Sequence, residues 1–186
     1  MEGVRAFARL SQKPGRLQRK LPRRRNGSAN VKKTEGRIAR LHQLIRRIRA
    51  DFLHKLSTRW GKSHAIIFVE DVNVQGMARS AAGTVENPGR NVKAKSGLNR
   101  EILDQAWGAF LRLLEYKLER RGGRLVRIPH AYSSRECSEC GHISVANRPS
   151  REVFHCEACS HTEHADVNAA KVILKRGLRF LLQPAA

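Results

Sequence analysis

Apolar side chains recur at helical intervals in two long segments of the chain. In residues 34–58 they follow one another at spacings of three, four and one, and in residues 98–121 they form one stripe that includes Trp107 and Phe110. Such spacings gather side chains on one face of a helix, so both segments are predicted to be amphipathic helices with Trp107 and Phe110 in the core. Gly122 is expected to end the second helix, because glycine adopts the left-handed conformation without strain.

Two short runs rich in branched apolar residues predict strands over residues 64–70 and 124–128. The first run is continuous and ends at Glu70, a pattern typical of a strand that is buried on both faces of a sheet. Residues 72–97 lack periodicity and contain several glycines, so they are predicted to form a long loop. Strand, helix and strand in this order predict an α/β architecture.

Basic charge is concentrated at the beginning of the chain. The sequence holds 37 Lys and Arg against 16 Asp and Glu, for a formal net charge of +21, and sixteen of the basic residues lie in residues 1–50 beside two acids. A field of one sign captures phosphate through counterion release, whereas a merely solvated face mixes both signs. Proline and glycine interrupt residues 1–33, which predicts an irregular basic arm that binds nucleic acid. Phosphate contacts are expected from Arg19, Lys20, Arg23, Arg24, Arg25, Lys32 and Lys33.

Length and composition exclude several classes of protein. A chain of 186 residues with 40% hydrophobic residues can bury one modest core, so it is not a large multidomain enzyme. Its sequence has no run near the roughly 18 apolar residues of a membrane helix, and residues 1–15 lack the apolar segment of a secretory signal. We therefore expect a cytoplasmic, nucleoid-associated protein with no membrane partner.

All four cysteines fall in one short segment, which predicts a zinc ribbon over residues 136–160. Two CxxC pairs separated by fifteen residues can place four thiolates around a tetrahedral ion; the ligands are Cys137, Cys140, Cys156 and Cys159. Two disulfides are the competing interpretation, but a reducing cytoplasm disfavours them. A closed shell of four thiolates leaves no position for water, so the zinc is expected to be structural. The nearby His142, His155 and His161 are then expected to be solvated or to contact phosphate.

Two acids lie where predicted elements end or begin. Glu70 ends the first strand, and Asp166 lies at the start of a C-terminal helix predicted within residues 161–186. Taken alone, Asp166 is explained by the favourable position of a carboxylate in a first helical turn. Asp71 points away from Glu70 in a strand and is expected to be structural.

Three segments containing these residues occur in an order that resembles the TnpB (OrfB) family of bacterial insertion sequences. They are residues 68–77, 133–141 and 164–170, and residues 33–60 are similar to that family as well. The resemblance implies a RuvC-like fold of the ribonuclease-H type, built from residues 34–135 and 161–186 with the zinc ribbon inserted. It also implies an RNA-guided DNA endonuclease that binds DNA and guide RNA, with Glu70 and Asp166 as ligands of paired Mg²⁺ ions.

One departure from the family pattern changes the expected activity. The family has a first catalytic aspartate on an early strand, and the acids before Glu70, which are Glu2, Glu35 and Asp51, follow no strand-like run. We therefore expect a truncated TnpB-like protein that binds nucleic acid but does not cleave it alone, since two-metal hydrolysis needs several carboxylates. The alternative is an active endonuclease that is completed by dimerisation or by a separate N-terminal partner. A third interpretation is a basic ribosome-like or transcription-like zinc ribbon protein, which the contexts of Glu70 and Asp166 disfavour.

Overall fold

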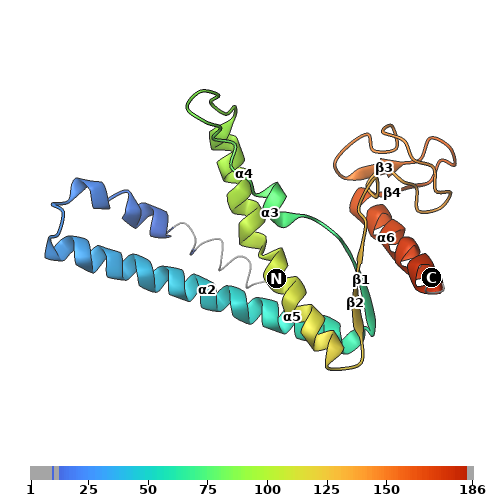
Figure 1. Ribbon diagram of the computed structural model, residues 1–186, viewed down its shortest axis with the longest axis horizontal. Helices are drawn as coiled ribbons and strands as arrows, with labels where there is room; N and C mark the ends of the chain where they lie inside the picture. The colour runs from blue at the N-terminus through green and yellow to red at the C-terminus, as the bar shows by residue number, and fades with distance from the viewer. Residues whose placement is uncertain (1–9, 11–12, 184–186) are drawn as a thin grey trace. The chain divides into compact units, whose positions relative to one another are not determined.

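The computed structural model describes residue 10 and residues 13–183 of the chain (Figure 1). The chain divides into two compact units, one of residues 1–63 and 109–117 and the other of residues 64–108 and 118–186. Each unit buries side chains of its own. Among the described residues, no helix combines the length and the apolar character that crossing a membrane requires.

The first unit is built on one long helix, α2, which spans Ala29–Ser63. This helix begins earlier and ends later than the predicted range of 34–58. Ser28 precedes it, and its Oγ accepts a hydrogen bond from the N–H of Val31 (3.3 Å), which satisfies one donor of the first turn. The buried side chains of α2 include Val31, Ile45 and Leu53.

The predicted irregular arm of residues 1–33 is helical in much of its described part. Residues 13–18 form a helical segment, and a 3-10 helix, η1, spans Leu21–Arg23. Pro22 lies in the first turn of η1. Proline is tolerated in a first turn because the N–H that it lacks would have no helical partner there, so its presence did not indicate an irregular chain.

The helix α5, Trp107–Glu119, contributes residues 109–117 to the first unit. Phe110 is buried as predicted, with 5% of its surface exposed, and its ring packs edge to face with that of Trp60 at a centroid distance of 5.4 Å. Lys117 ties α5 to α2, because its Nζ donates to three oxygens at 2.7–2.8 Å; the acceptors are His54 O, Ser57 Oγ and Thr58 Oγ1. Burial lowers the pKa of Lys117.

The second unit carries both sheets and the C-terminal helix. Strands β1, Ile66–Glu70, and β2, Arg124–Ile128, pair in parallel, with Glu70 opposite Ile128. Strands β3, Val153–His155, and β4, Thr162–His164, form an antiparallel pair. The remaining helices are α3 (Val74–Met77), α4 (Val92–Gln105) and α6 (Ala165–Leu182).

The helix α6 packs against the β1–β2 pair. Val126, Ile128 and Ile173 form a buried cluster with Phe68 beside it. A Cβ at Gly177 would lie 2.2 Å from Cδ1 of Phe68, so only glycine permits this close approach of helix to strand. Strand β1 was predicted to be buried on both faces, but most of its residues are half-buried. Among the described residues it pairs with β2 alone.

The predicted helix over 98–121 is two helices in the structure. Ala106 adopts the left-handed conformation (φ 52°, ψ 36°) and separates α4 from α5, while α4 begins at Val92, within the predicted loop of 72–97. The amide of Asn99 holds α4 to the preceding segment by donating to Ala78 O (2.9 Å). The break redirects the apolar stripe, so Trp107 is half exposed rather than part of the core.

Candidate metal centre and nucleic-acid interface

The four cysteines converge on one point in the second unit. All are free thiols, and their sulfur atoms lie within 4.8 Å of one another. The Cys137–Cys159 and Cys140–Cys156 sulfur pairs are 3.7 and 3.6 Å apart. Sulfurs around a tetrahedral zinc with bonds of about 2.3 Å are about 3.8 Å apart, whereas a disulfide needs about 2.05 Å. The cluster therefore fits a four-coordinate metal site, as the spacing predicted, and does not fit the disulfide alternative.

Each cysteine pair sits in a tight turn with the same hydrogen bonds. In the first turn, Gly141 N–H donates to Cys137 O (2.9 Å), and in the second, Ser160 N–H donates to Cys156 O (2.9 Å). Gly141 and Ser160 both have positive φ angles, of 78° and 58°. The left-handed residue after each second cysteine turns the chain back, which brings the two sulfurs of a pair to the same side.

Hydrogen bonds within the cysteine cluster shift the pKa values of Cys156 and Cys159 in opposite directions. Burial opposes the charged form of Cys156, but the backbone N–H groups of Cys159 and Ala158 and the neighbouring thiols lower its pKa to about 6. The backbone N–H of His161 acts to lower the pKa of Cys159, but the Cys140 thiol and burial raise it to about 12. One thiolate thus forms readily and a second is disfavoured beside it, which is the charge pattern that a bound cation relieves.

Two buried asparagines hold the ribbon in place, and the sequence pattern did not single them out. Asn147 donates from Nδ2 to Arg135 O (2.9 Å) and His142 O (3.1 Å). Asn168, on α6, accepts from the N–H of Ser138 (2.9 Å) and donates to Glu136 O (2.8 Å). Both side chains are fully buried. The signal for Asn168 was an asparagine among apolar residues inside a helix, where its low helix propensity calls for another role.

The three histidines near the cysteines contact side chains within the ribbon or just after it. His142 Nε2 lies 3.1 Å from Glu157 Oε1, and His155 Nδ1 lies 2.8 Å from Thr162 Oγ1. Hydrogen bonds from Ser144 and His142 lower the pKa of Glu157. Each of these contacts engages one ring nitrogen, and His155 is exposed, so contact of these histidines with solvent or phosphate stays a prediction.

His161 belongs to a small charged cluster at the same end of the ribbon. Its Nε2 lies 3.5 Å from Glu163 Oε2, and Lys171 of α6 donates to the other oxygen of that carboxylate. The ion pair with Lys171 lowers the pKa of Glu163. The pair joins β4 to α6, beside the buried cluster of Cys137, Phe154, Cys156 and Ala165.

Glu70 ends β1 and is held by one side-chain hydrogen bond. Ser133 Oγ donates to Glu70 Oε1 (2.8 Å), and Ser133 itself is 4% exposed. The next residue, Asp71, donates its backbone N–H to Ile128 O (2.9 Å) and extends the pairing with β2. Glu70 is thereby oriented by the segment that leads into the first cysteine pair.

Asp166 lies in the first turn of α6. His164 precedes the helix, and its Nδ1 accepts from the N–H of Asp166 (3.2 Å), so His164 rather than Asp166 caps the helix. The Asp166 side chain is 80% exposed, and its Oδ1 lies 3.8 Å from Arg148 Nη2. Its position in the first turn was predicted correctly.

The described residues contain one group of three or more clustered metal-binding side chains, and it is the cysteine cluster. Neither Glu70 nor Asp166 belongs to such a group. A centre that hydrolyses phosphodiesters with two ions uses several convergent carboxylates. The described side chains therefore do not assemble the full magnesium site that the family resemblance implies.

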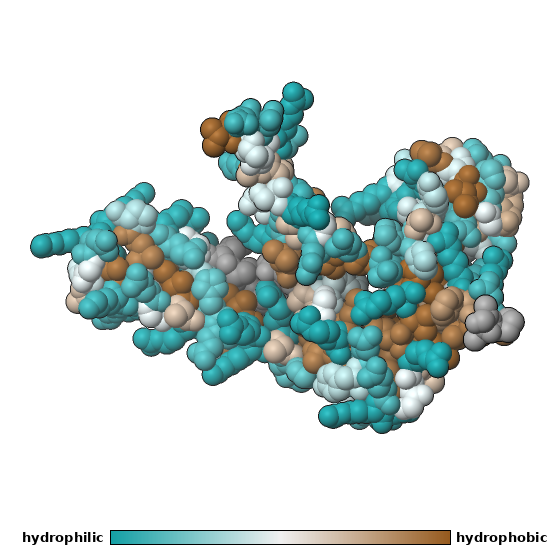
Figure 2. Space-filling model, in the orientation of Figure 1, coloured by the Kyte–Doolittle hydropathy of each residue, from teal (hydrophilic) through white to brown (hydrophobic). Residues whose placement is uncertain are grey.

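The predicted phosphate contacts all have exposed side chains; they are Arg19, Lys20, Arg23, Arg24, Arg25, Lys32 and Lys33. Arg24 also has a structural role, because its Nη1 donates to Asn30 O and to Thr34 Oγ1, each at 2.9 Å. Within residue 10 and residues 13–183, the side chains of the other six make no ion pair. Hydrophilic side chains project along the face of α2 that Figure 2 shows.

Two family models match the sequence. The "Probable transposase" model of the OrfB family matches residues 2–81. The "Cas12f1-like, TNB domain" model matches residues 107–173, a range that includes all four cysteines.

Curated relatives match over nearly the whole chain. The InsQ protein of Escherichia coli, whose name proposes an RNA-guided DNA endonuclease, is 49% identical over 176 residues, which cover 95% of this chain and 44% of InsQ. A protein of Streptomyces pristinaespiralis with the same proposed activity in its name is 35% identical, over 88% of this chain and 37% of its own length. The chain thus spans less than half the length of these relatives.

Solved structures share the fold. A CRISPR-Cas12f ternary complex matches with a TM-score of 0.59 at 20% identity, over 91% of this chain and 32% of the other. A Cas12f1 protein in complex with single-guide RNA and target DNA matches with a TM-score of 0.52 at 22% identity, over 73% of this chain and 36% of the other. At this level of identity the likeness concerns the fold alone.

Proposed function

Because this chain belongs to the TnpB (OrfB) family, we propose that it is a nucleic-acid-binding protein that engages DNA and a guide RNA. The main support is the set of exposed basic side chains around η1 and the start of α2, six of which have no acidic partner among the described residues. With a net charge of +21, the chain repels itself unless a polyanion neutralises it. A phosphate backbone supplies that charge.

The cysteine cluster is proposed to hold one structural zinc ion. The sulfur separations of 3.6 and 3.7 Å support this assignment, as do the matching turns around the two pairs. A shell of four thiolates has no open position, so the ion stabilises the fold of the ribbon and takes no part in hydrolysis. The ribbon in turn fixes the start of α6 through Asn168.

Glu70 and Asp166 remain proposed magnesium ligands on the strength of the family resemblance. Neither of them belongs to a group of three or more clustered metal-binding side chains in the described part of the chain. The chain alone is therefore proposed to bind nucleic acid without cleaving it, because two-metal hydrolysis requires a larger set of carboxylates.

Nucleic-acid binding can be tested by the salt dependence of affinity for a fluorescent DNA or RNA oligonucleotide. Replacing Lys33 by Gln should lower the slope of log affinity against log salt by about one unit, because one phosphate contact is lost. Lys55→Gln is the matched control on the same helix, and it should change the slope little because Asp51 already pairs with Lys55 at 2.7 Å. An affinity that does not depend on salt would contradict the proposal.

Cleavage can be tested separately by incubating a supercoiled plasmid with the purified chain and Mg²⁺. We expect no nicking above the level of a Glu70→Ala variant. If the chain nicks the plasmid and the Glu70→Ala substitution abolishes the nicking, the proposal that the chain alone does not cleave DNA is refuted. Such nicking would favour instead an endonuclease completed by a second copy, and mixing Glu70→Ala with Asp166→Ala chains would then restore activity.

A further inference from the structure

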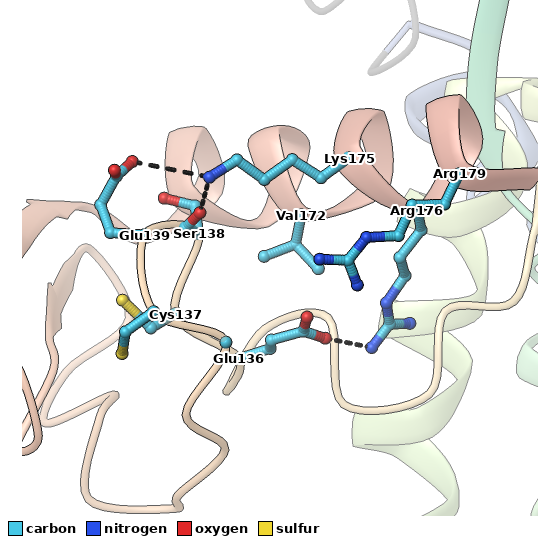
Figure 3. A pocket seen from close by; sticks show the side chains of 10 residues that line it. Glu136, Cys137, Ser138, Glu139, Val172, Lys175, Arg176 and Arg179 are labelled. Atoms are coloured by element: carbon cyan, nitrogen blue, oxygen red, sulfur yellow. Dashed lines mark hydrogen bonds and ion pairs between the residues drawn. The ribbon is translucent and has the colours of Figure 1, made fainter. Parts of the chain in front are cut away.

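A cavity of about 320 Å³ lies between the first cysteine pair and α6 (Figure 3). One wall is formed by residues 136–141 of the ribbon. The opposite wall is formed by α6, with Val172, Lys175, Arg176 and Arg179. Both walls belong to the second unit.

The three basic residues of the α6 wall differ in how far they are already paired. Arg176 is engaged, because its Nη2 bonds to Glu136 Oε2 and its Nη1 donates to Pro129 O (2.9 Å). Its side chain is 24% exposed. Arg176 and Glu136 together therefore form a fixed, neutralised part of the cavity wall.

Lys175 and Arg179 hold the charge that is not neutralised. Lys175 donates to Ser138 O, but its Nζ is 4.0 Å from Glu139 Oε1, and both side chains are about half exposed. An ion pair that is this long and this exposed to solvent contributes little to stability. The guanidinium of Arg179 is exposed and makes no ion pair or hydrogen bond within the described residues. Its five N–H donors thus border the cavity without a protein acceptor.

We propose that this cavity binds one phosphodiester group of a nucleic-acid strand, with Arg179 and Lys175 as its ligands. A planar guanidinium donates to two phosphate oxygens at once, and an ammonium beside it adds a point charge. The inference rests on the proposed nucleic-acid binding and assigns it a site apart from the basic residues of η1 and α2.

The ribbon wall of the site is held rigidly, which favours a defined ligand geometry. Asn168 bonds to the backbone of Ser138 and Glu136, and Lys175 donates to Ser138 O. A strand bound here would therefore contact the ribbon and α6 together. Glu139 lies at the cavity and competes with the phosphate for Lys175.

The test compares single charge changes in the full chain by fluorescence anisotropy with a short single-stranded DNA oligonucleotide. Arg179→Gln and Lys175→Gln should each weaken binding about tenfold, as expected for a lost charge-assisted contact. Arg121→Gln is the matched control, an exposed arginine of the same unit that does not line the cavity, and it should weaken binding by less than about threefold. Glu139→Gln should strengthen binding by a few-fold, a gain that misfolding cannot produce.

The outcomes separate this inference from the proposed function. Equal effects of Arg179→Gln and Arg121→Gln, with salt-dependent binding retained, would overturn the cavity assignment and leave nucleic-acid binding standing. Failure of the wild-type chain to bind any oligonucleotide would refute the proposed function itself, and this inference with it. A competition experiment with inorganic phosphate tells a nucleic-acid site from a site for free phosphate. If about 10 mM phosphate abolishes the part of the binding that depends on Arg179, the cavity binds the free anion, and the proposal that it binds a nucleic-acid strand is overturned.

Discussion

The two residues that follow the cysteine turns differ in how easily they adopt the left-handed backbone conformation found there. Gly141 and Ser160 each follow the second cysteine of a pair, and both have a positive φ. Glycine adopts this conformation without strain, whereas a residue with a Cβ pays about 1 kcal/mol there. The Ser160 side chain makes no hydrogen bond among the described residues that would offset the strain.

Replacing Ser160 by glycine should therefore stabilise the zinc-loaded ribbon. We expect the free energy of unfolding in urea to rise by about 0.5–1 kcal/mol, since the removed strain exceeds the added freedom of the unfolded chain. The reciprocal change Gly141→Ser should lower it by a similar amount. A loss of stability in both variants would contradict this account of the turns.

At the scale of elements, the turn from α5 to β2 requires a very close backbone contact. A Cβ at Gly123 would lie 2.5 Å from the carbonyl oxygen of Ala65, which accepts the N–H of Arg124 (2.8 Å) at the start of the β1–β2 pair. Gly123→Ala should lower the free energy of unfolding by about 1–3 kcal/mol, because this backbone must move apart.

The control for this prediction is the same substitution where space is open. Gly97 lies inside α4, and no atom lies within 4 Å of a Cβ built there. Gly97→Ala should raise stability by about 0.5–1 kcal/mol through helix propensity. Thermal or urea unfolding of the two variants should thus give opposite signs, and a loss at both positions would show that close contact is not the cause.

Local sequence signals determined some elements and missed others. The strand 124–128 was predicted correctly and the end of α5 to within two residues, because branched residues and the Gly122-Gly123 pair act locally. The break at Ala106 was not predicted, because alanine is the strongest helix former and no neighbouring residue indicates a left-handed conformation there. The break leaves Trp107 half exposed, which the continuous apolar stripe did not indicate.

In the candidate site, too, some features could be predicted from the sequence and others could not. The spacing of the cysteines predicted their convergence, because ligand geometry is encoded in short intervals. The partners of Glu70 and Asp166, which are Ser133 and Arg148, lie far from them in the sequence, and no periodicity indicates such contacts. The buried asparagines were missed for the same reason.

At the scale of the whole molecule, removal of zinc should affect the two units unequally. The ribbon buries few apolar side chains of its own, with Phe154 the largest, so a metal contribution of about 10 kcal/mol is expected to hold it folded. Helix α2 and its contacts with α5 contain no metal ligand. A strong chelator should therefore unfold the ribbon while most of the helical circular dichroism remains.

The measurement combines a zinc assay with nuclear magnetic resonance of backbone amides. We expect one zinc per chain, and loss of dispersed signals from residues 136–164 after chelation, with signals of α2 unchanged. Cys156→Ser should reproduce the chelated state, whereas Ser150→Ala, an exposed change in the same ribbon, should not. Dispersed ribbon signals in the metal-free chain would contradict a structural role for zinc.

Hydrogen exchange at the backbone amide of Ser138 reports on the contact between the ribbon and α6. The amide hydrogen is enclosed by the Asn168 carboxamide, whose side chain has no exposed surface. Solvent deuterium can reach that hydrogen only when the ribbon lifts away from α6, so its exchange rate measures the free energy of that opening. Ligands that fasten the two parts together will slow the exchange, and those that bind elsewhere will leave it unchanged.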